Sequence, residues 1–110
     1  MGVKYNHYYS GKHVYGCRRC NTHLSRKEHI MSKDFRGQHG KAYLFRDVVN
    51  VIYADPERRT MLTGDFIVRD ISCNYCGETV GWTYDKAFKS TEEYKVGKFI
   101  LEVKILAEVQ

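Results

Sequence analysis

Apolar side chains recur at every second position in several short segments of this chain, a period that predicts β-strands rather than long helices. The pattern is clearest over residues 98–106, where apolar side chains from Phe99 to Ile105 alternate with Glu102 and Lys104. Further segments rich in Val, Ile, Tyr and Phe have the composition typical of strands. These further predicted strands span residues 13–17, 21–25, 41–45, 48–53, 66–72 and 79–84.

Breaks between the predicted strands carry turn signals. Two glycines three apart in residues 35–40 predict a turn or bulge, and Thr63-Gly64-Asp65 predicts a hairpin turn. Pro56 predicts a loop over residues 55–59, and the polar residues 89–95 predict another. Residues 26–34 leave an irregular loop and a single helical turn both open.

Faces can be assigned within the predicted strand 66–72. Because successive side chains of a strand point to opposite sides, Phe66 and Val68 are expected on one face. Ile67 and Ile71 are expected on the other.

Length and composition indicate a single folded domain of 110 residues, 43% of them hydrophobic. We expect residues 1–12 to form an N-terminal tail and residues 13–110 to form the folded domain. No apolar run approaches the ~18 residues of a membrane span, and the first thirty residues contain no signal-peptide pattern. The expected location is therefore a reducing compartment, the nucleus and cytoplasm.

The four cysteines form two Cys-x-x-Cys pairs, Cys17 with Cys20 and Cys73 with Cys76. Two thiolates at this spacing can face one ion, so two such turns complete a closed, tetrahedral Cys₄ site for one structural Zn²⁺. Disulfides need an oxidising compartment, and a redox-active pair usually opens a helix in a βαβ unit, which this pattern lacks. The long interval between the pairs predicts that zinc joins an early part of the chain to a late part.

The formal net charge of +5 raises the possibility of a nucleic-acid partner. Arg18-Arg19, Arg58-Arg59 and the nine tyrosines would supply charge and stacking platforms. The basic residues are interleaved with acidic ones, however, which is typical of an ordinary solvated surface. Arginines beside Cys17 and Cys20 also have a simpler role, since they offset the negative charge of a zinc-thiolate centre.

Catalysis is not expected. A reductase would need a nucleophilic cysteine outside the metal site, and all four cysteines are assigned to zinc. A hydrolytic zinc centre would need an open coordination position, which four cysteines do not leave.

At the level of whole motifs, the chain resembles the Yippee family of small zinc proteins from about Val14 to Glu102. One departure is Phe66, where many family members have His after the Thr-Gly turn. The resemblance rests on the following segments: Tyr15-Gly16-Cys17-x-x-Cys20-x-x-His23-Leu24, Ser32-Lys33-Asp34-Phe35-x-Gly37-x-x-Gly40-x-Ala42-Tyr43-Leu44-Phe45, Val48-Val49-Asn50-Val51, Arg59-x-Met61-x-Thr63-Gly64, Asp70-Ile71-x-Cys73-x-x-Cys76, Gly81-Trp82-x-Tyr84, and Glu93-Tyr94-Lys95-x-Gly97-Lys98-Phe99-Ile100-Leu101-Glu102.

The resemblance implies an all-β fold called a β-tent, in which two antiparallel sheets are pinned at one end by the Cys₄ zinc site. It also implies a protein-interaction module that acts as an adaptor or regulator of a CTLH/GID-type ubiquitin ligase and is linked to the cell cycle. Because one fold carries several functions, a nucleic-acid-binding zinc domain remains an alternative.

A small-ligand site is a further alternative, and it also comes from resemblance. In the ligand-binding domain of cereblon, which is similar here, a Gly-Trp-x-aromatic segment supplies two walls of an aromatic cage for a cyclic imide or a cation. The matching residues are Trp82 and Tyr84, with Phe66 as a third wall. The simpler interpretation is that Trp82 is a core tryptophan packed beside the zinc site, which is the usual role of a lone Trp in a small β domain.

Overall fold

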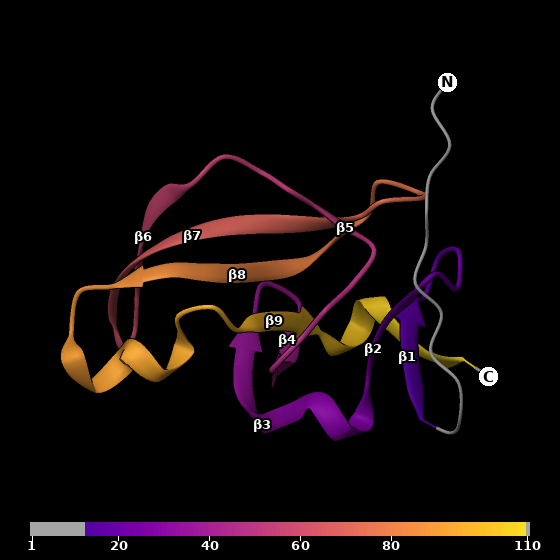
Figure 1. The fold of residues 1–110 in the computed structure, drawn as a ribbon, viewed down its shortest axis with the longest axis horizontal. Helices are drawn as coiled ribbons and strands as arrows, with labels where there is room; N and C mark the ends of the chain where they lie inside the picture. Colours follow the sequence, from indigo (N-terminus) through magenta and orange to yellow (C-terminus); the bar gives the residue numbers. More distant parts are fainter. Residues whose placement is uncertain (1–12, 110) are drawn as a thin grey trace.

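Two antiparallel sheets make up residues 13–109, the part of the chain that the computed structural model describes (Figure 1). The smaller sheet has the order β10-β1-β2, and the larger has the order β3-β4-β9-β8-β7-β5, with β6 also paired to β7. The strands are β1 (Val14–Cys17), β2 (His23–Arg26), β3 (Ile30–Gly37), β4 (Gly40–Phe45), β5 (Val51–Tyr53), β6 (Glu57–Met61), β7 (Gly64–Cys73), β8 (Thr79–Ala87), β9 (Phe99–Glu102) and β10 (Leu106–Val109). Three short 3₁₀ helices connect them: η1 (Lys27–His29), η2 (Ser90–Lys95) and η3 (Val103–Ile105).

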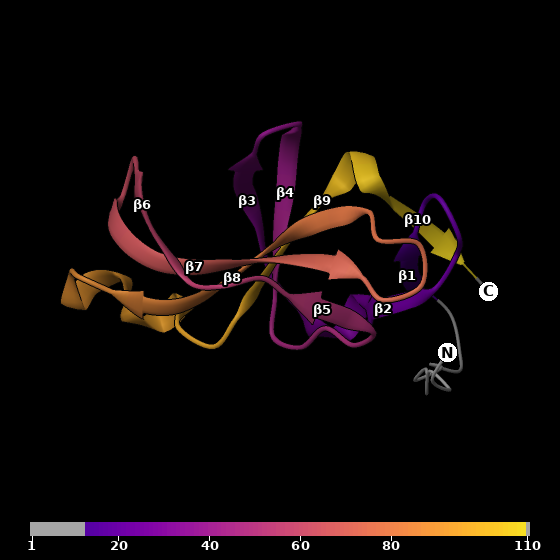
Figure 2. The ribbon, with the colours of Figure 1, turned by 90° about the horizontal axis from the view of Figure 1, so that it is seen from above.

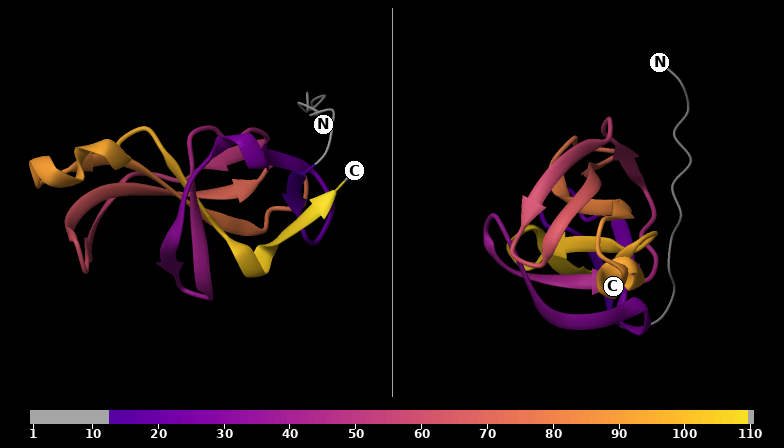
Figure 3. Two further views of the ribbon diagram at one scale, coloured as in Figure 1. Left: turned by 90° about the horizontal axis from the view of Figure 1, so that it is seen from below. Right: turned by 90° about the vertical axis from the view of Figure 1, so that its left-hand side faces the viewer.

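The arrangement confirms the predicted all-β fold with two antiparallel sheets. Figure 2 shows the β3–β4 hairpin rising out of the plane of β7 and β8. The smaller sheet gathers at one end of the molecule, while the β6–β7 hairpin and η2 lie at the other (Figure 3). No helix within residues 13–109 is long and apolar enough to cross a membrane. The expected tail, residues 1–12, lies outside the described residues.

Each face of the larger sheet packs against its own core cluster, and β7 contributes to both. Phe66 and Val68 belong to one cluster, whereas Ile71 and Cys73 belong to the other. The predicted division of Phe66 and Val68 from Ile71 is therefore confirmed, as the strand period requires. The metal ligands thus sit in one core, and Trp82 and Tyr84 sit in the second.

The strand predicted over residues 98–106 is two strands. β9 ends at Glu102, η3 turns the chain, and β10 then pairs with β1 in the other sheet. The apolar alternation does not report this break: Ile100 and Leu101 of β9 are buried in different core clusters, and Val103 and Ile105 lie in η3. Hydrophobic period alone cannot show a change of sheet.

The loop predicted over residues 55–59 is wrong beyond Pro56. β6 begins at Glu57, pairs with β7 and returns through a two-residue turn at Leu62-Thr63. Arg59 forms ion pairs with Glu57 and Asp70, so its charge is satisfied within the sheet. Those ion pairs stabilise a strand whose own residues have little β propensity.

The strand predicted over residues 48–53 is shorter than expected, since β5 begins only at Val51. Asn50 has a positive φ of 61°, which interrupts an extended backbone, and its side-chain amide donates a 2.7 Å hydrogen bond to the carbonyl of His23. This bond ties the chain before β5 to β2.

Three segments between the predicted strands also form regular secondary structure. Residues 26–34, where a loop and a helical turn were both open, contain η1 and then the start of β3. The turn predicted within residues 35–40 is confirmed as the β3–β4 hairpin, closed at Gly40 with φ of 102°. Residues 89–95, predicted as a loop, contain η2.

Candidate metal centre and aromatic cavity

Both Cys-x-x-Cys segments fold into the same tight turn. The Cys17 amide donates to the carbonyl of Thr22, and the Asn21 amide donates back to the carbonyl of Cys17. Cys73 repeats this pattern with Glu78 and Gly77. Asn21 and Gly77 occupy equivalent positions and have φ of 62° and 80°.

Left-handed backbone at Asn21 and Gly77 allows these turns, whereas Gly16, the residue before Cys17, lies in β1 and is paired with β10. Asn is among the residues that best tolerate this left-handed conformation, and Gly adopts it without strain. The signal for these turns is therefore the Asn or Gly that directly follows each Cys-x-x-Cys.

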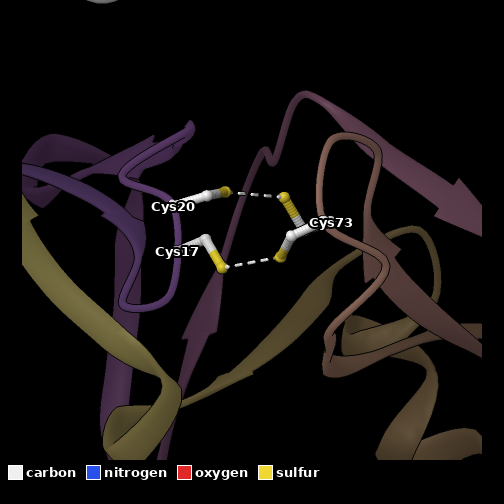
Figure 4. Close-up of side chains that lie close together, drawn as sticks. Cys17, Cys20 and Cys73 are labelled. Carbon is white, nitrogen blue, oxygen red and sulfur yellow. Dashed lines mark hydrogen bonds between the residues drawn. The ribbon is translucent and has the colours of Figure 1, made fainter.

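The two turns bring all four cysteine sulfurs together. Sγ of Cys17 lies 3.5 Å from Sγ of Cys76, Sγ of Cys20 lies 3.5 Å from Sγ of Cys73, and all four lie within 4.8 Å of one another (Figure 4). A tetrahedral Zn²⁺ with bonds of roughly 2.3 Å would hold its sulfurs about 3.8 Å apart. The donor set and its spacing therefore fit one closed zinc site. His23 is not among the clustered ligands found in residues 13–109.

Burial and hydrogen bonding act in opposite directions on the pKa values of the thiols. Burial raises the pKa of Cys17 to about 12. At Cys20 burial acts in the same direction, but hydrogen bonds from the side chain and backbone of Thr22 outweigh it and lower the pKa to about 7. Zinc must therefore displace a firmly held proton from Cys17, and it finds a readily ionised thiol at Cys20.

Two arginines flank the cysteine turns, and Arg19 is paired with a carboxylate. Arg19 forms a 3.2 Å ion pair with Glu78, which links one cysteine turn to the other. The Arg18 guanidinium donates to the carbonyl of Lys104. Neither contact involves a cysteine sulfur, so the idea that these arginines offset the charge of the zinc-thiolate centre stays a prediction.

Away from the cysteines, a cavity of about 680 Å³ opens on the side of the larger sheet that buries Phe66 and Val68. It lies between the β3–β4 hairpin, the β6–β7 hairpin, β8 and η2. Its lining residues are Ser32, Asp34, Phe35, Arg36, Gly37, Gln38, Arg59, Met61, Leu62, Thr63, Asp70, Thr79, Gly81, Trp82, Tyr84, Tyr94, Lys95 and Glu102.

Trp82 and Tyr84, which the resemblance singled out, both line this cavity and are also buried core residues. Trp82 is only 7% exposed, so it is both a core residue and a cavity wall. It does not belong to the core cluster that contains Cys17 and Cys73, so its expected place beside the zinc site is wrong. Phe66 lies behind the cavity, with its ring centroid 4.9 Å from that of Tyr84, and is not among the lining residues.

The ammonium group of Lys95 occupies the middle of the aromatic cluster, a placement that no sequence pattern indicated. Nζ lies between 5.0 and 5.7 Å from four ring centroids, which belong to Phe35, Phe66, Tyr84 and Tyr94. Its side chain is only 4% exposed and forms a 2.8 Å ion pair with Glu92. Buried lysines need such partners, because desolvating an unpaired charge is costly.

A buried tyrosine beside Lys95 predicts an alkaline pH dependence. Burial raises the pKa of Tyr84 to about 12, above its usual value near 10. The contribution of the protonated Tyr84 hydroxyl to the unfolding free energy is therefore fully present below about pH 10. It is lost as the pH rises towards 12. Between these pH values, wild type should lose about 2 kcal/mol more unfolding free energy than Tyr84→Phe.

Urea unfolding at several pH values would measure this difference. Tyr75→Phe, at an exposed tyrosine, controls for the general effect of alkali. Parallel pH curves for wild type and Tyr84→Phe would contradict the prediction.

The fold and the cysteine cluster define a class, a zinc-binding domain built from two antiparallel sheets. The sequence model of the family described as Yippee zinc-binding/DNA-binding/Mis18, centromere assembly, matches residues 13–110. The chain belongs to this Yippee/Mis18 family. The four cysteines accordingly hold a single structural zinc ion.

Individual relatives agree with this assignment. A protein yippee-like from Solanum tuberosum is 49% identical over 89 residues, which cover 81% of this chain and 69% of the relative. The human protein yippee-like 4 is 46% identical over 90 residues, which cover 82% of this chain and 71% of the relative. A crystal structure of a Mis18 "Yippee-like" domain shares the fold with a TM-score of 0.68 at 16% identity, covering 88% of this chain and 94% of that one.

Proposed function

We propose that this protein is a non-catalytic interaction module whose aromatic cavity receives a segment of a partner protein. The observation that carries the proposal is the cavity itself, whose walls Trp82 and Tyr84 stand on a strand of the larger sheet. Leu62, at the tip of the β6–β7 hairpin, is fully exposed at the cavity rim. Concave apolar sites with a few polar groups are typical binding sites.

A non-catalytic role also follows from the chemistry of the cysteines. All four are committed to one closed site, so no thiolate among them remains as a nucleophile and no coordination position remains for a substrate.

The partner that we propose is a subunit of a CTLH/GID-type ubiquitin ligase, with the protein acting as its adaptor or regulator in cell-cycle processes. The support for this partner is the family resemblance. The same resemblance supports a location in the nucleus and cytoplasm.

A second candidate is a nucleic-acid-binding domain, which the words "DNA-binding" in the family description favour. The charge distribution gives it less support, because five arginines form ion pairs with carboxylates of the same chain. The pairs are Arg19–Glu78, Arg26–Glu28, Arg58–Asp65, Arg59–Asp70 and Arg69–Asp85. Phosphate binding would have to compete with these internal partners.

Affinity purification of the tagged protein at moderate salt, followed by mass spectrometry, tests the proposal. We expect ubiquitin-ligase subunits to be recovered with the wild type and lost with Leu62→Ser and Trp82→Ala. Leu62→Ser changes only an exposed side chain, so its loss of binding cannot be attributed to unfolding. A thermal melt shows whether Trp82→Ala is still folded.

Ile52→Ser is the matched control, since Ile52 is an exposed aliphatic residue on β5 outside the cavity lining. If Leu62→Ser and folded Trp82→Ala recover the ligase subunits as well as wild type does, the cavity is not the binding site. Recovery of only nucleic acid, released steeply by added salt, would favour the second candidate.

A further inference from the structure

Two hydrogen-bond donors of the cavity, on Lys95 and Trp82, are not fully paired within the described residues. An ammonium group has three N–H donors. The ammonium of Lys95 has two oxygen neighbours, Oε1 of Glu92 at 2.8 Å and Oγ1 of Thr63 at 3.0 Å. The surrounding ring faces attract its charge but accept no strong hydrogen bond. Within residues 13–109, one Lys95 donor therefore has no oxygen acceptor.

A second donor in the cavity is also without an acceptor. The indole N–H of Trp82 is buried and makes no well-aligned hydrogen bond within residues 13–109. It approaches the Tyr84 hydroxyl closely enough to affect the pKa of that group, but not with hydrogen-bond geometry. A buried donor without a partner costs free energy, and a ligand that supplies an acceptor recovers it.

Two carboxylates of the cavity lining, the part-exposed Asp70 and the buried Glu102, already have donors from the same chain. Oδ1 of Asp70 accepts from the guanidinium of Arg59, and Oε1 of Glu102 accepts a 2.7 Å hydrogen bond from the amide of His39. The remaining charged lining residues, Asp34 and Arg36, are exposed. Among the described lining residues, only Trp82 has a buried side-chain atom without a hydrogen-bond partner, and that atom is a donor. Oε1 of Glu92, outside the lining, is a buried acceptor that faces the Lys95 ammonium without hydrogen-bond geometry.

Occupation of the aromatic cluster by Lys95 has a further consequence. A cluster of aromatic rings is often a binding site for the ammonium group of a ligand. Here that place is filled by a side chain of the same chain, and a second cation would meet like-charge repulsion at short range.

We propose that the cavity binds a ligand that joins a carboxylate to a compact apolar body. The Lys95 ammonium and the Trp82 indole N–H donate to the carboxylate, and the rings of Trp82 and Tyr84 bound the apolar part. A free small acid and the terminal carboxylate of a peptide share this chemistry. The inference rests on the proposed function in taking this cavity as the binding site.

The single tryptophan of the chain provides a specific measurement. A ¹H–¹⁵N NMR spectrum of the zinc-loaded protein contains one indole N–H signal, and that signal belongs to Trp82. Three probes of similar size are titrated: cyclohexanecarboxylate, cyclohexanecarboxamide and cyclohexylammonium. We expect the carboxylate to shift the signal and to bind about tenfold more tightly than the amide, because its hydrogen bonds are charge-assisted. The ammonium probe should not shift it.

Variants test the part played by Lys95. In Lys95→Met, the affinity for cyclohexanecarboxylate should fall about tenfold while that for the amide stays nearly unchanged. Lys86→Met is the control, since Lys86 is exposed, lies 4.9 Å from the ring centroid of Phe88 and is outside the cavity lining. If Lys95→Met does not fold, the ranking of the three probes on wild type still decides the proposal.

The proposal would be overturned by equal shifts from the ammonium and carboxylate probes, by an unchanged carboxylate affinity in folded Lys95→Met, or by no shift with any probe at millimolar concentration. N-acetyl-Gly-Phe with a free carboxyl group, compared with its C-terminal amide, separates the two sources. Tighter binding of the free peptide acid than of cyclohexanecarboxylate indicates a chain terminus, and the reverse indicates a small acid. Recovery of a protein partner with no probe binding would reject this inference and leave the proposed function standing.

Discussion

Cys73→Ser is expected to release the zinc ion and to unfold the domain. Cys73 is fully buried, and its sulfur is one of the four that surround the metal. A structural zinc site contributes about 10–16 kcal/mol of binding free energy, whereas whole domains are stable by about 5–15 kcal/mol. A hydroxyl is a poor zinc ligand, so a large part of the binding free energy should be lost.

Zinc content by elemental analysis and a thermal melt by circular dichroism would measure the two effects together. Tyr75→Ser is a matched control, because Tyr75 lies in the same turn between Cys73 and Cys76 and is exposed. It should retain one zinc per chain and melt close to wild type. A well-folded, metal-free Cys73→Ser would show that the site does not hold the fold together.

Gly81→Ala should destabilise the protein by about 3 kcal/mol through a clash between neighbouring strands. A Cβ atom at Gly81 would lie 1.7 Å from the carbonyl oxygen of Ile100 on β9. Backbone cannot move aside as the end of a flexible side chain can, so β8 and β9 would have to separate. Trp82, the next residue, is paired with Ile100 and would be displaced with β8.

Urea unfolding of Gly81→Ala beside Lys86→Ala would measure this cost, since Lys86 is an exposed residue on the same strand. We expect the control to remain within about 0.5 kcal/mol of wild type. The indole N–H signal of Trp82 should also shift in any Gly81→Ala that remains folded. A change in unfolding free energy similar to that of Lys86→Ala would mean that the strands adjust without cost.

The zinc centre and the cavity have separate roles in this fold. The cysteine turns lie at the end of β1 and of β7, where they join the smaller sheet to the larger. The cavity is formed farther along the same larger sheet, and it adjoins a different core cluster. Substitutions at its rim, such as Leu62→Ser, should therefore leave zinc binding unchanged, which makes the two roles separable by experiment.

The metal site could be predicted from sequence because its ligands lie in two short segments. The ligands of the metal are four residues of one type in two short turns, and each turn is closed by hydrogen bonds within six residues. Such a pattern is visible in sequence because its spacing is set by the geometry of the ion. The likeness between the two turns extends to Asn21 and Gly77, since both accept a positive φ.

The cavity is the opposite case. Lys95 belongs to a polar segment whose composition predicts an exposed loop, and it is nevertheless buried. Its burial depends on rings from β3, β7 and β8 and on a carboxylate three residues before it. No local pattern encodes the three rings, because they come from separate strands and surround Lys95 only after the sheet has formed.

Sequence by itself determined the all-β class, the metal and its four ligands, since strand period and ligand spacing are properties of neighbouring residues. Tertiary structure decided that residues 98–106 divide between two sheets and that Trp82 is both core and cavity wall. It also decided that an ammonium group fills the aromatic cluster. These features depend on which distant segments pack together, and the free energy of that packing is a property of the whole fold.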